Sequence, residues 1–453
     1  MKQDLRQWVA IHASDVTPNG EEKKKVQQVA QLMLSRCKVA AERLNEKVTI
    51  ILGGSYAHDT WLPGKGDIDV FLAFDKAVGK DGLSVKGLKI AHEALAGYDV
   101  VTRYAEHPYL EGFVEGVRVN VVPCLNVKKG EWISAADRSP HHTEYMSAKL
   151  NEGMKLQVRL LKRLMQTQRL YGAEIKVRGF SGYVCEVLIA KYGNLEELLK
   201  AASSWRNDTV ISLEEYRQNV EGFAILDPVD TNRNLARAIA PWKVAEFIFL
   251  SRIILKGTKC DPFMQPLLDY PEPNDLSDLL ENVFVLYFTH RKENEDTIWG
   301  ELARSSQAIV RHLTQEGFEV LNHTYSSDLH SSAICLLLAG ERIARLRSRT
   351  GPEVYRDKET DTFLKSSKTL TWFFSDDFRS RRIERSSFPD ILHLIEFYME
   401  RPVERIGFSK GIAEGAKKSW KMMNGKEAML ASDEVVKDAV RRVFGYSPAV
   451  DSC

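Results

Sequence analysis

The sequence has few cysteines, and their spacing forms no metal-binding or disulfide pattern. Only six occur among 453 residues, and no two stand in a C-x-x-C arrangement. Cysteines paired at that spacing are typical of zinc ribbons, and dense, regularly spaced sets are typical of small secreted domains. The sequence therefore argues against both classes, and we expect most of these side chains to be buried thiols.

A long apolar run is also missing. No stretch approaches the roughly 18–20 consecutive apolar residues that a membrane-spanning helix needs. The first six residues (MKQDLR) lack the apolar core of a signal peptide. We therefore expect a cytoplasmic protein. Its length predicts about two to four domains, because a single core seldom grows to 453 residues.

Neither sign of charge is in excess. Lys and Arg number 63 against 62 for Asp and Glu, which gives a net charge of +1. A nucleic-acid partner would therefore have to bind a local basic surface. Three late groups of basic residues are candidates: Arg342, Arg345, Arg347 and Arg349; Arg379, Arg381, Arg382 and Arg385; and Lys410, Lys417, Lys418 and Lys421. For any single group, a solvated charged surface is the simpler interpretation.

A change of periodicity near the start of the chain marks its first domain. Residues 4–46 carry apolar side chains at helical spacing, whereas 47–52 (KVTIIL) is short and β-branched and predicts a strand. Further strands are expected at 67–74 and 117–123, and a helix is expected over 151–170. This alternation of helices and short strands indicates a mixed α+β protein.

Two carboxylates open the second expected strand. Asp67 and Asp69 are two residues apart, so their side chains leave the same face of a sheet. Neighbouring carboxylates repel each other unless a cation lies between them, and Mg²⁺ prefers such oxygen ligands. A lone Asp-x-Asp is more often a solvated strand or turn. In a suitable context, the pair predicts a Mg²⁺ site for phosphoryl transfer.

The context is the glycine turn Gly53-Gly54-Ser55, which ends the first strand. Glycines let backbone N–H groups approach a phosphate, Ser55 adds a hydroxyl donor, and a helix opening after it would favour an anion. Taken alone, this motif is usually just a turn. Its position before the Asp-x-Asp strand favours a nucleoside triphosphate site without a Walker motif.

The two motifs together resemble the signature of the DNA polymerase beta nucleotidyltransferase superfamily. The run Gly54-Ser55-x-x-x-x-Thr60-x-Leu62 is followed by Asp67-x-Asp69. Further segments make the sequence similar to the archaeal class I CCA-adding enzymes, the tRNA nucleotidyltransferases: Arg103–Tyr109, Val119–Cys124, Asp137–His142, Val177–Tyr183 and Asp227–Asp230. The similarity is clear over the first half of the chain.

In that family the enzyme adds C, C and A to the 3′ end of tRNA from CTP and ATP, without a nucleic-acid template. The resemblance implies that Asp67 and Asp69 bind the catalytic Mg²⁺ and that Ser55 binds the triphosphate. It also implies tRNA lacking all or part of its CCA end as the partner, and a homodimer. Contacts to the phosphates, sugar or base of the nucleotide are implied for His142, Lys162, Tyr171, Ser181, Tyr183 and Arg233.

Two positions depart from the family pattern. Asn120 stands where the family has a third catalytic, metal-binding carboxylate. An amide oxygen can contact a metal, but it carries no charge and cannot accept a proton. We therefore expect strongly impaired nucleotide addition, whether Asn120 was engineered or arose by divergence. His58 replaces a frequent arginine near the phosphates. It either hydrogen-bonds the nucleotide or has a local role in its helix.

Two other functions stay open alongside CCA addition. One is a poly(A) polymerase-like nucleotidyltransferase, which would make a long homopolymer instead of three nucleotides. The other is an inert RNA-binding homologue, which Asn120 favours. The presence of Ser55, Asp67, Asp69 and Lys162 weighs against that second alternative.

The resemblance also implies a domain order. We expect an α+β multidomain protein with a polymerase-beta-like nucleotidyltransferase head, built on a mixed sheet with helices, at 1–150. A helical neck that receives the base follows at 151–224. An α/β body at 225–270 and 385–453 and a tail inserted at 271–384 would both bind tRNA.

Overall fold

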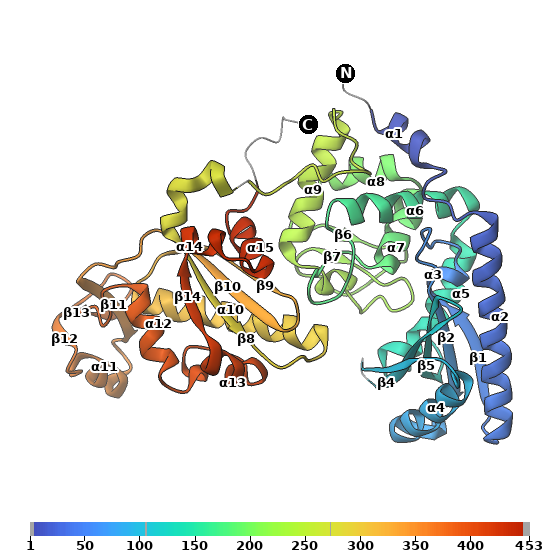
Figure 1. Ribbon diagram of the computed structural model, residues 1–453, viewed down its shortest axis with the longest axis horizontal. Coiled ribbons are helices and arrows are strands. Elements are labelled where there is room, and N and C mark those ends of the chain that lie inside the picture. The colour runs from blue at the N-terminus through green and yellow to red at the C-terminus, as the bar shows by residue number, and fades with distance from the viewer. Residues whose placement is uncertain (1–3, 105–106, 272, 447–453) are drawn as a thin grey trace. The chain divides into compact units, whose positions relative to one another are not determined.

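The computed structural model describes residues 4–104, 107–271 and 273–446 (Figure 1). Ala105 and Glu106, which belong to one family-like segment, lie outside these residues, as does Cys453. The chain divides into two compact units, the first ending at Leu267 and the second beginning at Leu268. The expected head, neck, body and tail form a finer division, which stays a prediction.

The first unit combines helices with a five-stranded and a two-stranded sheet. Its α-helices are α1 (Leu5–His12), α2 (Gly20–Arg43), α3 (Gly54–Ala57), α4 (Gly79–Ala94), α5 (Ser139–Lys149), α6 (Glu152–Thr167), α7 (Gly182–Tyr192), α8 (Leu195–Ala202) and α9 (Pro241–Leu255). Its strands are β1 (Val48–Gly53), β2 (Ile68–Asp75), β3 (Val100–Tyr104), β4 (Pro108–Val114), β5 (Val117–Asn126), β6 (Val210–Ile211) and β7 (Ala224–Ile225).

The five-stranded sheet has the order β1-β2-β5-β4-β3. β2 and β5 run parallel, and the other neighbours are antiparallel, so the sheet is mixed as expected. The strands predicted at 47–52, 67–74 and 117–123 are confirmed as β1, β2 and β5. The parallel pair matters most for function because it sets Asp69 directly beside Asn120.

The helical structure expected over 4–46 is confirmed for most of these residues, and it consists of two helices. α1 ends at His12, and α2 begins at Gly20. The Asn19 side chain accepts the backbone N–H of Glu22 at 2.8 Å, which caps α2. A polar cap of this kind satisfies an otherwise orphaned helix N–H, so the chain restarts a helix there. The spacing of apolar residues alone does not reveal this break between the two helices.

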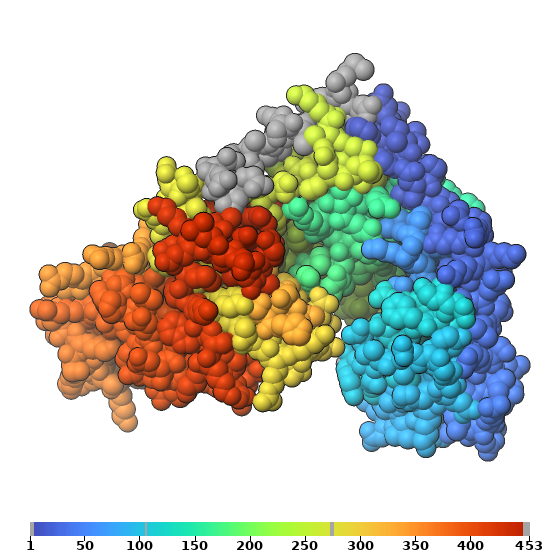
Figure 2. All heavy atoms as spheres, viewed as in Figure 1, coloured from blue at the N-terminus to red at the C-terminus, as the bar shows by residue number. Residues whose placement is uncertain are grey.

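The sheet buries one face against α2 and α4 (Figure 1). In β2 that face carries the fully buried Ile68, Val70, Leu72 and Phe74, which belong to one core cluster. Because strand side chains alternate, Asp69 projects from the opposite face. Figure 2 shows α2 as a continuous dark-blue outer surface of this unit. The principal core thus lies on one side of the sheet, and the polar site lies on the other.

The turn from β1 into α3 brings the backbone close to the site. Gly54 has φ of +66°, a conformation that glycine adopts without steric cost. A Cβ at this position would overlap Asp69 Oδ2, whereas a Cβ on Gly53 would meet the Phe71 ring and Thr143 Oγ1. Both glycines are therefore required by close approach, and at Gly54 the turn also needs its backbone freedom.

The second unit contains a four-stranded and a three-stranded antiparallel sheet, in the orders β14-β8-β10-β9 and β11-β13-β12. Its strands are β8 (Val283–Thr289), β9 (Val320–Ser327), β10 (Ser331–Leu338), β11 (Leu346–Glu353), β12 (Thr369–Phe374), β13 (Arg379–Arg385) and β14 (Lys421–Asn424). Its α-helices are α10 (Glu295–Glu316), α11 (Asp357–Leu364), α12 (Ile391–Met399), α13 (Lys410–Ser419), α14 (Gly425–Leu430) and α15 (Glu434–Val443).

The structure also bears on the expectations for the cysteines and for membrane-spanning helices. Cys37, Cys124, Cys185 and Cys335 are buried free thiols. Within the described ranges, no helix is both long and apolar enough to cross a lipid bilayer.

We expect Gly54→Ala to destabilise the first unit by about 1–2 kcal/mol, the usual cost of a left-handed conformation for a residue with a Cβ. It should also displace Asp69. Urea unfolding would measure the loss. Gly20→Ala is the matched control, because a Cβ there meets nothing within 4 Å and Gly20 opens a helix. Equal stabilities for the two variants would contradict the interpretation.

Candidate active site

The polar face of the sheet pairs Asp69 with Asn120. The two residues are register partners in β2 and β5, and Asn120 Nδ2 donates to Asp69 Oδ1 at 2.9 Å. Asn120 Oδ1 is buried and has no hydrogen-bond partner among the described residues. Burial raises the pKa of Asp69 above its usual range, and the hydrogen bond from Asn120 partly opposes that rise.

Asp67 is paired with a cation from β5. Arg118 donates to Asp67 Oδ2, and its Nη1 lies 4.0 Å from Glu111 Oε2 on β4. Glu111 in turn accepts from Arg103 Nη2 on β3 at 2.8 Å. A row of alternating charges therefore crosses the sheet from Arg103 to Asp67. Arg118 was not among the residues predicted from sequence.

The side chains on this face supply the type of ligand atom that Mg²⁺ prefers, which is oxygen. Asp67 and Asp69 supply hard carboxylate oxygens, and the unpartnered Asn120 Oδ1 is a neutral oxygen beside them. In the parts of the chain that the structure describes, no three His, Cys, Asp or Glu side chains lie together as a metal-binding group. Here the third ligand is an amide, so a bound ion would be met by two anionic groups at most.

A second polar cluster is built around the buried carboxylate of Glu186, on α7. Glu186 is 2% exposed, and its oxygens accept from Thr60 Oγ1 and lie 2.8 Å from His58 Nδ1. Lys162 Nζ, from α6, lies 3.6 Å from Glu186 Oε1 and donates to the Thr60 carbonyl at 3.0 Å. The cluster thus joins α6, α7 and the chain after α3.

Glu186 is held in its charged form by these neighbours. Burial by itself raises the pKa of Glu186, but the nearby charge of Lys162 and the hydrogen bond with His58 outweigh it and lower the pKa. Lys162 is equally buried, at 2% exposure. An isolated charge in this position would be very costly, so the two groups require each other.

The start of α7 gathers further predicted residues. Ser181 caps the helix, accepting the N–H of Val184 at 3.2 Å. A Cβ on Gly182 would lie 3.0 Å from the Tyr171 hydroxyl and 3.5 Å from Lys162 Nζ. Burial raises the pKa of the Tyr171 hydroxyl, so it stays a neutral donor. Glycine at 182 therefore leaves room between two donor side chains.

A third cluster surrounds Asp227, whose side chain is fully buried. Its Oδ2 lies 2.9 Å from His142 Nε2 and accepts from Arg233 Nη1 at 3.0 Å, while Oδ1 accepts from the Tyr183 hydroxyl at 3.2 Å. The His142 and Tyr183 rings stack with centroids 4.2 Å apart. The structure thus brings His142, Tyr183 and Arg233 together through one carboxylate.

Asp227 is strongly stabilised as an anion. Burial alone raises the pKa of its carboxyl, but the hydrogen bonds from His142, Val229 N–H and Arg233 outweigh it and lower the pKa to about 2. Burial and Asp227 together raise the pKa of the Tyr183 hydroxyl, so Tyr183 remains a hydrogen-bond donor. Asp227 therefore orients three side chains that are themselves candidates for nucleotide contact.

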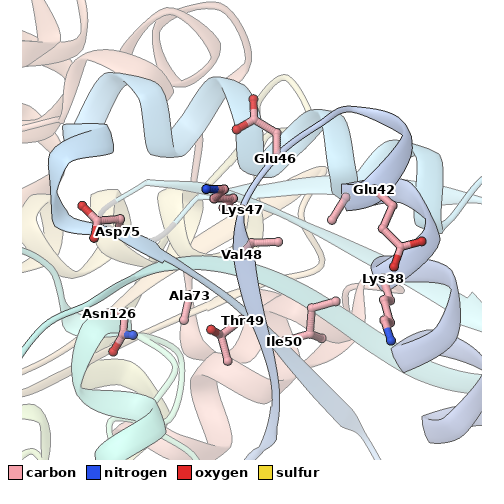
Figure 3. Close-up of a pocket in the computed structure, with 11 residues that line it drawn as sticks. Lys38, Glu42, Glu46, Lys47, Val48, Thr49, Ile50, Ala73, Asp75 and Asn126 are labelled. Carbon is pink, nitrogen blue, oxygen red and sulfur yellow. The ribbon is translucent and has the colours of Figure 1, made fainter.

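A prominent pocket of about 510 Å³ lies away from these clusters (Figure 3). It is lined by charged residues of α2, including Lys38 and Glu42, and by Val48–Ile50 of β1. Asp75, at the far end of β2, also faces it. Since Asp69 lies near the start of β2, this pocket sits at the other end of the same strands and is not the site of the carboxylates.

The sequence predicted several side chains that the structure brings together in these clusters, but not the buried carboxylates that pair with them. Glu186 lies within an apolar stretch of α7, and Asp227 was noted only as part of a family-like segment, without a role of its own. A charged residue inside a helix that is otherwise buried was an available signal, because such a group is seldom buried unless it is paired. Arg118, two residues before Asn120, shares its strand face and could have been found by alternation.

Comparison with known proteins relates this geometry to a family. Three family descriptions match successive parts of the chain: "Nucleotidyltransferase domain" at 34–142, "tRNA nucleotidyltransferase, second domain" at 156–264 and "CCA-adding enzyme, C-terminal domain" at 281–425. The CCA-adding enzyme of Pyrobaculum neutrophilum is 36% identical over 77% of this chain and 82% of its own length. The chain belongs to the CCA-adding enzyme family.

Other relatives of that family are similarly close. The CCA-adding enzyme of Saccharolobus shibatae is 34% identical over 80% of this chain and 84% of its own. That of Archaeoglobus fulgidus is 36% identical over 74% and 77%. Among solved structures, a cytoplasmic RNA terminal U-transferase is 11% identical over 58% of this chain and 99% of that one, with a TM-score of 0.45. The resemblance seen in the first half of the sequence is thus confirmed, and the match extends into the second half.

We expect Asp227→Asn to lower the free energy of unfolding by about 2 kcal/mol at pH 7, since each pKa unit corresponds to about 1.4 kcal/mol. The folded pKa of Asp227 is about 2, below its ordinary value. Its contribution is therefore fully present above about pH 4 and is lost as the pH falls towards 2. Denaturant unfolding of both proteins across this range should show their difference shrinking. A constant difference would contradict the assignment.

Proposed function

We propose that this chain adds C, C and A to the 3′ end of tRNA from CTP and ATP, releasing pyrophosphate. Membership of the CCA-adding enzyme family carries this proposal. The position of Asp69 on the polar face of a mixed sheet, with Asp67 directly before its strand and a glycine turn against it, supports it. A poly(A) polymerase-like activity would be recognised by a long homopolymeric product, and CCA addition stops after three nucleotides.

Asp67 and Asp69 would hold Mg²⁺, with the Asn120 amide oxygen as a neutral neighbour. When bound, the ion neutralises triphosphate charge and lowers the barrier to attack by a hydroxyl. The chain's own part is to fix Asp69 on the rigid strand β2 and Asp67 directly before that strand. Arg118 must give up at least part of its contact with Asp67 for that carboxylate to bind a cation, and Glu111 lies within reach to receive it.

The triphosphate and the sugar would be bound by the donors gathered around α3 and α7. Ser55 lies in α3, next to the glycine turn. Lys162 and Tyr171 converge on Gly182, and Ser181 stands at the same helix start. His142, Tyr183 and Arg233, oriented by Asp227, would contact the remainder of the nucleotide. Buried donors of fixed direction hold an anion without further reorganisation, which favours the transition state.

Asn120 limits this activity. In place of a carboxylate it supplies an amide whose N–H₂ donates to Asp69, so it can neither add negative charge nor accept a proton from the tRNA hydroxyl. Transition-state stabilisation of this kind accounts for roughly 10²–10⁴ in rate. We therefore propose that the chain binds nucleotide and tRNA but adds nucleotides slowly.

We expect Asn120→Asp to raise the rate of CMP incorporation into tRNA lacking its CCA end by roughly 10²–10⁴-fold. Labelled CTP and ATP, used in single-turnover conditions, would measure it. Asn126→Asp, at the far end of the same strand, is the matched control and should leave the rate unchanged. Equal rates for this chain and Asn120→Asp would refute the limitation.

The second unit offers the surface for tRNA. Not all of its arginines are available, because Arg347 and Arg382 form ion pairs of 2.7 Å with the fully buried Glu384 and support the three-stranded sheet. Arg345 and Arg385 are exposed at one end of β11 and β13. Such side chains bind phosphates without distinguishing sequence, as an enzyme acting on every tRNA requires. Homodimerisation, as expected from relatives, remains a proposal.

We expect Arg345→Ala and Arg385→Ala each to weaken tRNA binding and to reduce the slope of log affinity against log salt by about 1. Filter binding across a salt series would measure this. Arg382→Ala should behave differently, because it leaves Glu384 partly unpaired and lowers the thermal stability. If Arg345→Ala and Arg385→Ala leave the slope unchanged, the assignment of these two residues is wrong.

A further inference from the structure

One ring nitrogen of His58 has no protein partner. Nδ1 lies 2.8 Å from Glu186 Oε2, but Nε2 is buried and makes no hydrogen bond within the described part of the chain. The residue is 4% exposed. Buried polar atoms are almost always satisfied, and an exception calls for an explanation such as a catalytic role. The Nε2 of His58 is therefore able to bond a partner that comes with the substrate.

The position of His58 indicates which part of the substrate that partner is. Ser55 and His58 are three residues apart on the α3 turn, so they lie on the same side of it. Three charged groups act on the imidazole: Glu186 from α7, Lys162 from α6 through Glu186, and Asp69 from β2, whose pKa the imidazole lowers. His58 therefore lies on the same turn as Ser55, the residue proposed to bind the triphosphate.

We propose that Glu186 and His58 form a carboxylate–imidazole pair in which Nε2 gives a proton to the departing pyrophosphate. This inference rests on the proposed function. The tRNA 3′ hydroxyl gives its proton to a water molecule, and as its oxygen bonds to the α-phosphorus, the bond from that phosphorus to the bridging oxygen breaks. Its electron pair stays on the pyrophosphate oxygen, which takes the proton from the imidazolium. Solvent then returns a proton to His58.

The chemistry of the pair suits this step. With Nδ1–H donated to Glu186, Nε2 carries a proton only in the imidazolium form, and the carboxylate of Glu186 balances that charge. Glu186 is a positioning residue here, because it fixes the ring without touching the nucleotide. The arginine that is frequent at this position in the family can bind a phosphate but cannot release a proton. The proton-donor role therefore belongs to the histidine of this chain.

The test varies the leaving group in single-turnover addition to tRNA lacking its CCA end. CTP analogues with a β,γ-CH₂ or a β,γ-CF₂ bridge release leaving groups of high and low basicity. His58→Arg retains a phosphate contact but removes the proton donor. We expect it to slow the CH₂ analogue by roughly 10²-fold, the lower bound for general acid catalysis, and to slow the CF₂ analogue far less. Glu186→Gln should shift the ratio of the two rates in the same direction.

His12→Gln is the matched control, since His12 is a buried histidine 2.6 Å from Asp261 whose ring nitrogens both have partners. It should leave the ratio unchanged. Thermal unfolding must show that His58→Arg is folded. An equal loss on both analogues would mean a phosphate contact only, and no loss would mean a structural role; either result overturns the proton transfer. If neither this chain nor Asn120→Asp incorporates CTP at all, the proposed function itself fails.

Discussion

The buried ion pair between Glu186 and Lys162 is the constraint on which the site depends. Neither group has enough solvent contact to be charged alone, and each offsets much of the free energy of burying the other, with the hydrogen bonds of His58 and Thr60 adding to the stabilisation of Glu186. Because Glu186 belongs to α7, Lys162 to α6, and Thr60 and His58 to the chain after α3, the pair also fixes where these three segments meet. The positions of the proposed nucleotide donors follow from that meeting point.

The sheet imposes a second constraint, which is the face from which the Asp69 side chain projects. Every second residue of β2 is buried under α2 and α4, so Asp69 has to face the other way. The parallel register with β5 then sets Asn120 directly beside it, and Gly53 of β1 lies on its other side. A change at position 120 therefore acts on Asp69 directly, without passing through the core. This explains how the residue can alter chemistry while the fold is retained.

Periodicity was sufficient for the three central strands, whereas the residues expected to contact the nucleotide came from the family resemblance and stay a prediction. Periodicity and motifs failed where the deciding interaction was remote in sequence. Asn19 restarts a helix through a local cap that apolar spacing does not reveal. Glu186 lies 126 residues from Thr60, and Asp227 lies 85 residues from His142, so no spacing rule links them. Each is a buried carboxylate whose partners are defined only by the folded chain.

The pairing of the carboxylates bears on what Asn120 does to the protein. Three carboxylates on adjacent strands would repel one another, and a cation between them would be needed to stabilise their charged forms. In this chain the Asn120 amide donates to Asp69 and Arg118 pairs with Asp67, so both anions are satisfied by the protein itself. Both carboxylates therefore have partners within the protein without a metal ion. Under the proposed function, the effect of Asn120 would fall on the reaction and not on the fold.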